Sequence, residues 1–128
     1  VLSPKLYREF GVPYNERIGE AFDGVVIHSC GDIKHVLPIM METKGLRGLD
    51  VTMPQISDSQ VIKEVAVGRT PINFRYFYWD HAEESVDQVE YTQKLLNSFG
   101  SHGVFFQTSA PTLDEALELR EKIHPLLT

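Results

Sequence analysis

The sequence predicts an α/β fold in which a leading helix is followed by four βα units with parallel strands. Four short apolar runs have the length and the β-branched or aromatic content of buried strands. Each run starts about one βα unit after the last, and helical patterns with capping residues fill the gaps. Because strands that alternate with helices form parallel sheets, this order predicts a parallel sheet with right-handed crossovers.

The first half of the chain contains the leading helix, two strands and a short helix. Ser3 and Pro4 have the order of an N-cap and a first helical residue, and Pro13 is expected to kink or break the helix that they start. A shorter helix is expected over residues 33–43, with Gly45 after it. The strands of the whole chain are expected at residues 24–28, 46–51, 71–75 and 103–107.

Capping signals mark the helices of the second half. Residues 57–60 and 112–115 each read as a capping box before an apolar helical pattern. Gly68 and Gly100 stand where helices of this kind end. One partial domain is expected over residues 1–128. Two architectures fit it: an open doubly wound sheet, or half of a (β/α)8 barrel, which needs about 250 residues when complete.

The composition is that of a globular domain and weighs against several classes of protein. The 128 residues are 42% hydrophobic and 23% charged, with a net charge of −6. This acidity weighs against nucleic-acid binding and against a polybasic membrane-surface protein. No apolar run reaches the roughly 18 residues that cross a bilayer, and we expect no signal peptide, because no charged segment followed by an apolar one stands at the start of this sequence. Because Cys30 is the sole cysteine, we expect a reducing, cytoplasmic location. The start at Val1 suggests a processed chain or an excised fragment.

The first predicted strand ends in a pair of potential metal ligands. In parallel α/β folds, ligands bind at the carboxyl ends of the strands. His28 and Cys30 are two residues apart, so in an extended chain their side chains point to the same face. Imidazole nitrogen and thiolate sulfur are both Zn²⁺ ligands, although a zinc site usually has at least three protein ligands. The alternative is a buried small cysteine beside a hydrogen-bonded histidine.

The second and third predicted strands bring further polar and aromatic residues to the same end of the sheet. Asp50 could orient a ligand or a metal-bound group, or it could accept a hydrogen bond that closes a loop. Residues 74–80 hold five aromatic side chains and Arg75. They could form a stacking wall for a flat ligand, with Arg75 binding a ligand carboxylate. They could equally pack into the core or against a partner.

Three segments of the sequence are similar to one known family. Residues 3–14 resemble a helix of the uroporphyrinogen decarboxylase superfamily, and Gly48-Leu49-Asp50 resembles one of its strand ends. Residues 26–32 are similar to the His-x-Cys-Gly strand end of its corrinoid-dependent methyltransferase branch. The resemblance covers nearly the whole chain and implies the C-terminal half of a TIM, or (β/α)8, barrel.

The resemblance implies either of two chemistries. In the methyltransferase branch, a methyl group moves between a corrinoid and a thiol that zinc holds as a thiolate. His28 and Cys30 would be two zinc ligands, and Asp50 would be a catalytic acid that orients a ligand or the substrate. The true decarboxylases of tetrapyrrole biosynthesis act without a metal. The implied partners are a second copy in a homodimer or an N-terminal half-barrel, and a corrinoid protein.

The sequence departs from both branches of the family. The second cysteine of the zinc site is missing, because the end of the fourth strand has residues 108–110, Thr-Ser-Ala, instead. The loop motifs of the decarboxylases are also replaced, at residues 74–80 and 107–111. Three functions are therefore expected, in this order: thiol methyl transfer, uroporphyrinogen decarboxylation, and a non-catalytic remnant that only binds or assembles.

Overall fold

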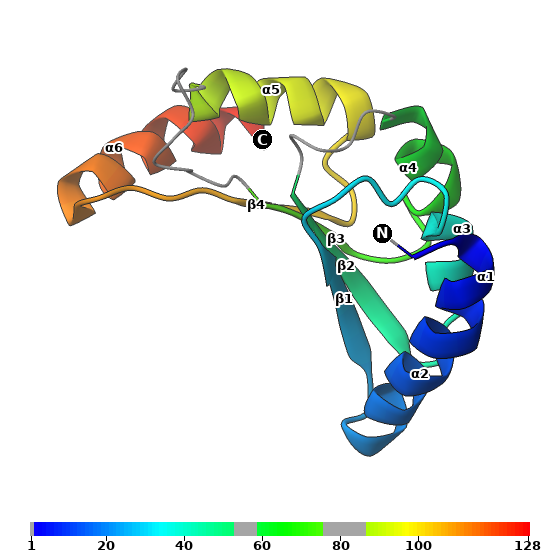
Figure 1. The fold of residues 1–128 in the computed structure, drawn as a ribbon. Helices are drawn as coiled ribbons and strands as arrows, with labels where there is room; N and C mark the ends of the chain where they lie inside the picture. The colour runs from blue at the N-terminus through cyan, green and yellow to red at the C-terminus, as the bar shows by residue number, and fades with distance from the viewer. Residues whose placement is uncertain (1, 53–58, 76–86) are drawn as a thin grey trace.

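Four parallel strands lie side by side in the order of the chain. The computed structural model describes residues 2–52, 59–75 and 87–128. The strands form one sheet, ordered β1-β2-β3-β4 with every neighbouring pair parallel, and helices alternate with them (Figure 1). The predicted α/β class and the parallel βα order are therefore confirmed. The strands are β1 (Val25–Ser29), β2 (Leu46–Thr52), β3 (Ile72–Arg75) and β4 (Val104–Gln107).

Helical segments precede the sheet and follow each strand. They are α1 (Pro4–Leu6), the π-helix η1 (Tyr7–Gly11), α2 (Val12–Ala21), α3 (Leu37–Met40), α4 (Ser59–Val65), α5 (Gln88–Phe99), α6 (Leu113–Ile123) and a final 3-10 turn (His124–Leu126). No helix within these described ranges is long and apolar enough to cross a membrane.

The leading helix continues through Pro13, where a kink or break was predicted. A break is ruled out, because helical backbone runs without interruption from α1 through η1 into α2, and the predicted kink stays a prediction. Proline has no N–H to donate, and its ring would clash with the carbonyl of a regular α-helical turn before it. The chain forms a π-helical turn at Tyr7–Gly11, and Pro13 then lies in the first turn of α2.

The helix expected over residues 33–43 is shorter in the structure. Only Leu37–Met40 is α-helical, with Pro38 in its first turn, where a missing N–H is tolerated. The caps of other helices match the sequence. The Thr112 hydroxyl accepts a hydrogen bond from the Glu115 N–H at 3.3 Å, and Gly100 ends α5 with a φ of 75°. The expected capping residues 57 and 58 lie outside the described residues.

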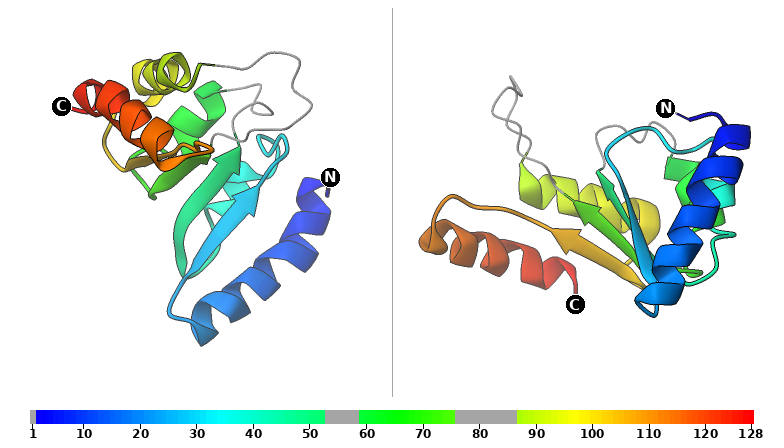
Figure 2. Two further views of the ribbon diagram at one scale, coloured as in Figure 1. Left: turned by 90° about the vertical axis from the view of Figure 1, so that its left-hand side faces the viewer. Right: turned by 60° about the horizontal axis from the view of Figure 1, so that its bottom comes forward.

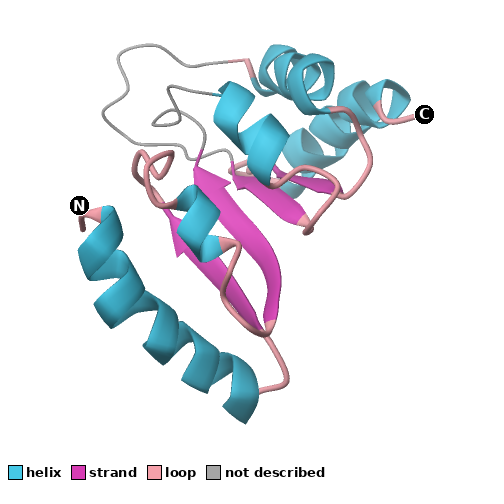
Figure 3. Cartoon of the chain, turned by 90° about the vertical axis from the view of Figure 1, so that its right-hand side faces the viewer, coloured by secondary structure: helices cyan, strands magenta, loops and turns pink. Residues whose placement is uncertain are grey.

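One face of the sheet is covered by helices and forms the core. Helices α2 to α5 lie on the same side of the sheet, and Figure 3 looks onto this covered side. The residues of β2 and β3 that point toward the helices are at most 2% exposed; they are Leu49, Val51, Ile72 and Phe74. The Phe74 ring stacks on Phe99 of α5, with 4.6 Å between the ring centroids. Burial of apolar area on this side supplies most of the stabilisation.

The opposite face of β1 to β3 carries no helix among the described residues (Figures 1 and 2). Two apolar side chains that belong to this uncovered face are largely exposed: Val26 at 59% and Phe105 at 60%. The strand register places Val26 opposite Gly48, and Phe105 opposite Asn73. The alternation of side chains along each strand thus separates a buried apolar face from a solvent-facing one.

Candidate functional site

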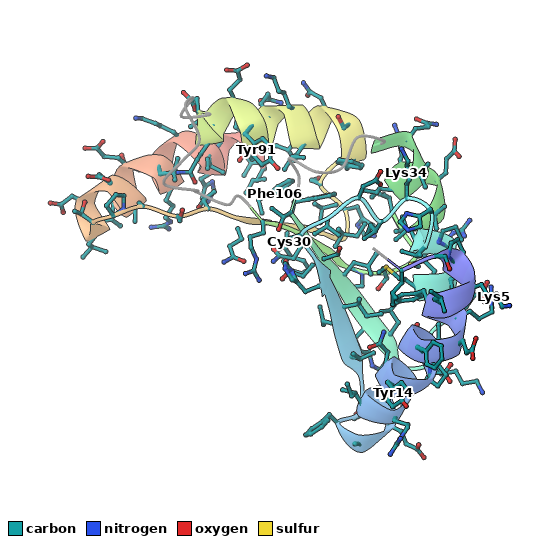
Figure 4. The ribbon with its side chains drawn as sticks, viewed as in Figure 1. Lys5, Tyr14, Cys30, Lys34, Tyr91 and Phe106 are labelled. Carbon is teal, nitrogen blue, oxygen red and sulfur yellow. The ribbon has the colours of Figure 1, made fainter. Side chains whose placement is uncertain are left out.

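The strand register brings the four predicted site residues together on the uncovered face. His28 in β1 is opposite Asp50 in β2, and Arg75 in β3 is opposite Thr52, two residues after Asp50. Cys30 follows β1 directly, at the carboxyl end of the sheet (Figure 4). The predicted placement of a polar site at the carboxyl ends of parallel strands therefore holds for these residues.

His28 links Cys30 to Asp50. The His28 Nε2 lies 2.9 Å from the Cys30 Sγ, and its Nδ1 lies 2.9 Å from the Asp50 Oδ2. Because an ionised carboxylate only accepts hydrogen bonds, Nδ1–H donates to Asp50. In the tautomer with its proton on Nδ1, the imidazole presents Nε2 as an acceptor to the thiol of Cys30. The Cys30 residue itself is exposed.

Asp50 is held by three donors from the two strands beside it, β1 and β3. Besides His28, its Oδ1 accepts from the Asn73 Nδ2 at 2.9 Å, and its Oδ2 pairs with the Arg75 guanidinium. The Asp50 side chain is 11% exposed, so the carboxylate is nearly removed from water. A buried carboxylate needs such partners, because an unpaired charge in this position would be strongly destabilising. These contacts fix Asp50, which in turn fixes the imidazole of His28.

Three further polar residues belong to the cluster and were not predicted. Asn73 also contacts Gln107, with its Nδ2 3.3 Å from the Gln107 Oε1, and the Thr52 hydroxyl donates to the Cys30 Sγ at 3.7 Å. The sequence could have predicted two of these residues, Thr52 and Asn73. Thr52 and Asn73 lie two residues from Asp50 and Arg75, so strand periodicity puts them on the same face.

Arg75 pairs with Asp50, and its role in binding a ligand carboxylate stays a prediction. One of its terminal nitrogens pairs with Asp50, and its buried Nε has no hydrogen-bond partner among the described residues. Arg75 therefore acts within the structure as a partner of Asp50. The other members of the predicted aromatic cluster, residues 76–80, lie outside the described residues.

The described residues do not form a complete zinc site. Two ligands of one tetrahedral zinc ion, with Zn–N of about 2.0–2.1 Å and Zn–S of about 2.3 Å, are roughly 3.6 Å apart. The His28 Nε2 and the Cys30 Sγ are 2.9 Å apart, which is a hydrogen-bond distance. No group of three His, Cys, Asp or Glu side chains able to hold a metal occurs in the described part of the chain. As they stand, these residues fit a hydrogen-bonded thiol and imidazole.

A groove of about 500 Å³ lies between β4 and α6, apart from the polar cluster. Apolar side chains from both elements contribute to its lining, among them Val104, Phe106, Ala116 and Ile123. None of the four predicted site residues lines it.

Comparison with known proteins does not assign a family to this fold and cluster. A scan against protein-family models, a search of curated proteins and a search of solved structures found no match. The uroporphyrinogen decarboxylase resemblance therefore stays a prediction from the sequence motifs, and the geometry of the cluster carries the functional argument.

Proposed function

We propose that this chain is the C-terminal half of a (β/α)8 barrel of the uroporphyrinogen decarboxylase superfamily, closer to its corrinoid-dependent methyltransferase branch. Its chemistry would be the transfer of a methyl group to or from a thiol at the cluster around His28. The observation that carries the proposal is His28 held between Cys30 and Asp50 at the carboxyl ends of the strands.

The strand order supports a half-barrel over an open doubly wound sheet. In doubly wound sheets the strand order reverses at a switch point, and helices cover both faces. Here the strands follow in chain order, and α2 to α5 share one side. In a closed barrel the other face of the strands is the interior, which side chains fill in layers. The exposed Val26 and Phe105 have the position of such interior residues.

The residues of the cluster have complementary roles in thiol chemistry. Asp50 orients the imidazole of His28, and Nε2 of His28 can take the proton of a thiol. Asn73 and Arg75 keep Asp50 in place. Where zinc is bound in this branch, it holds a thiol as a nucleophilic thiolate, and a zinc here would need a third ligand from outside the described residues.

The proposed half-barrel also needs a partner. Within the described sheet, β1 and β4 each pair with a single neighbour, and unpaired edges and exposed interior side chains promote association. The partner would be a second copy or an N-terminal half-barrel. A chain that associates without transferring methyl groups would be the non-catalytic remnant instead.

Methylcobalamin and a small aliphatic thiol provide a direct test of methyl transfer. The chain is incubated with both, with and without added Zn²⁺, and the methyl thioether is quantified by mass spectrometry. We expect product above the protein-free reaction, and its loss in His28→Ala and in Cys30→Ser. Glu20→Gln, an exposed position on α2, is the control and should keep the activity. A wild-type chain that forms no product above background would contradict the proposal.

A further inference from the structure

We infer that Cys30 is itself a metal-independent nucleophile toward soft alkyl electrophiles, with His28 as its proton acceptor and Asp50 as the positioning residue. The inference rests on the site of the proposed function and deepens it, because it makes the sulfur of Cys30 the thiol that receives the alkyl group. It depends on neither zinc nor a corrinoid.

The geometry of the three side chains is that of an activated nucleophile. The thiol and the imidazole are 2.9 Å apart, and the imidazole and the carboxylate are 2.9 Å apart. A nucleophile within hydrogen-bond reach of a base, with the base oriented by a third group, is the general arrangement for nucleophilic catalysis by cysteine. The distance between Nε2 and Sγ is the distance for this proton transfer, and it is shorter than two ligands of one zinc ion require.

The carboxylate behind His28 is fixed more firmly than a single contact would allow. Asp50 receives hydrogen bonds from Asn73 and Arg75 as well as from His28, and its side chain is 11% exposed. The imidazole is thereby held in the tautomer whose Nε2 accepts the thiol proton. The Thr52 hydroxyl, 3.7 Å from Sγ, adds a donor to the sulfur. Strands β1, β2 and β3 therefore cooperate to place one reactive atom.

The side of the sheet that carries Cys30 is also open among the described residues. Cys30 is exposed, the His28 side chain is 42% exposed, and no described helix covers this side of β1 to β3. A buried structural cysteine would be inert by comparison.

The covalent step forms one bond and breaks one. The electron pair of the Cys30 sulfur forms a bond to the alkyl carbon of R–X, and X leaves with the electron pair of the R–X bond. The thiol proton moves to Nε2 of His28, while Nδ1–H stays hydrogen-bonded to Asp50. The products are an S-alkylated Cys30, the anion X⁻ and a protonated His28, so charge and atoms balance without a metal.

Iodoacetamide tests the inference at a single atom, because Cys30 is the sole cysteine of the chain. The rate of carbamidomethylation is measured by mass spectrometry near pH 7 with a chelator present. We expect the native chain to react at least about tenfold faster than the same chain in urea. In enzymes, a positioned proton acceptor accelerates a reaction by about 100-fold or more, so this threshold is a tenth of the smallest usual acceleration. Equal rates would overturn the inference.

Two variants separate activation from accessibility. His28→Gln should bring the rate to within about twofold of the urea value, and Asp50→Asn should give an intermediate rate. His35→Gln is the matched control, since within the described residues the hydrogen bond of the His35 side chain is to the Leu2 carbonyl, and this variant should react like the native chain. Circular dichroism establishes that each variant is folded. If His28→Gln does not fold, Asp50→Asn decides, and an unchanged rate in that variant would refute the role of Asp50.

The outcomes distinguish this inference from the proposed function. Rapid, chelator-insensitive labelling without transfer from methylcobalamin would support the inference and contradict the methyltransferase. Methyl transfer to an added thiol with slow labelling of Cys30 would support the methyltransferase and overturn the inference. A labelling rate that falls on chelation would also overturn it, because a bound metal would then be the activator.

Discussion

The two faces of the sheet differ in burial, although the same strands form both: one face is covered by helices and the other meets solvent. On the helix-covered face, Leu49, Ile72 and Phe74 are at most 2% exposed and belong to the hydrophobic core, where Phe74 stacks on Phe99 of α5. On the other face, Val26 is 59% exposed and Phe105 is 60% exposed. One-residue alternation along a strand thus separates the residues that stabilise the fold from those that meet solvent.

The difference also separates two kinds of interaction. The covered face depends on apolar packing, whereas the uncovered face has one connected polar cluster from Cys30 to Gln107. Polar groups in such a cluster contribute little net stability when every partner is present, and their loss is costly when one partner is removed. Stability should therefore respond most to changes on the covered face, and reactivity to changes on the uncovered one.

Truncation of one phenylalanine on each face should give the largest contrast. Phe74→Ala removes a fully buried ring and should lower the free energy of unfolding by about 3–5 kcal/mol. Phe105→Ala removes a ring that is 60% exposed and should change it by less than about 1 kcal/mol. Urea unfolding of both variants measures the difference. Equal losses would show that a partner covers Phe105 in solution.

Removing the charge of Asp50 should have a smaller effect on stability. Asp50→Asn leaves the guanidinium of Arg75 without its carboxylate in a site that is 32% exposed, so a loss of about 1–3 kcal/mol is expected. Glu20→Gln removes the same charge from an exposed position and is the control. The two variants are compared by urea unfolding at neutral pH. A loss in the control as large as that in Asp50→Asn would point to net charge as the cause.

The smallest effect is expected from a tyrosine in the helical layer at alkaline pH. Burial raises the pKa of Tyr7 above its ordinary value, and the hydrogen bond from Asn15 opposes this shift. The folded chain therefore keeps this proton at a pH where the unfolded chain loses it. Stability from this group is complete below about pH 10 and is lost as the pH rises through the folded pKa. Urea unfolding at about pH 9 and about pH 11 measures the decrease, and Tyr7→Phe should reduce it. An identical decrease in Tyr7→Phe would refute this assignment.

Local sequence patterns predicted the elements and half of the site. Two-residue spacing placed His28 beside Cys30, and the strand end placed Asp50 near them. Periodicity did not reveal that Arg75 would be occupied by Asp50, because that contact depends on the register between β2 and β3. The strand order and the side on which the helices lie are set by long-range packing, which capping boxes and apolar runs do not encode.

The end of the chain at β4 and α6 is anchored more weakly than the central strands β2 and β3. Within the described fold, β4 pairs with β3 alone, and Ile123 is the single buried residue of α6. Segments with few buried apolar contacts open at a lower free energy than the global unfolding of a domain. A sheet built in chain order can thus lose its last βα unit while β1 to β3, and the contacts of His28 with Cys30 and Asp50, stay intact. Amide protons of β4 and α6 would therefore exchange with solvent before those of β2 and β3.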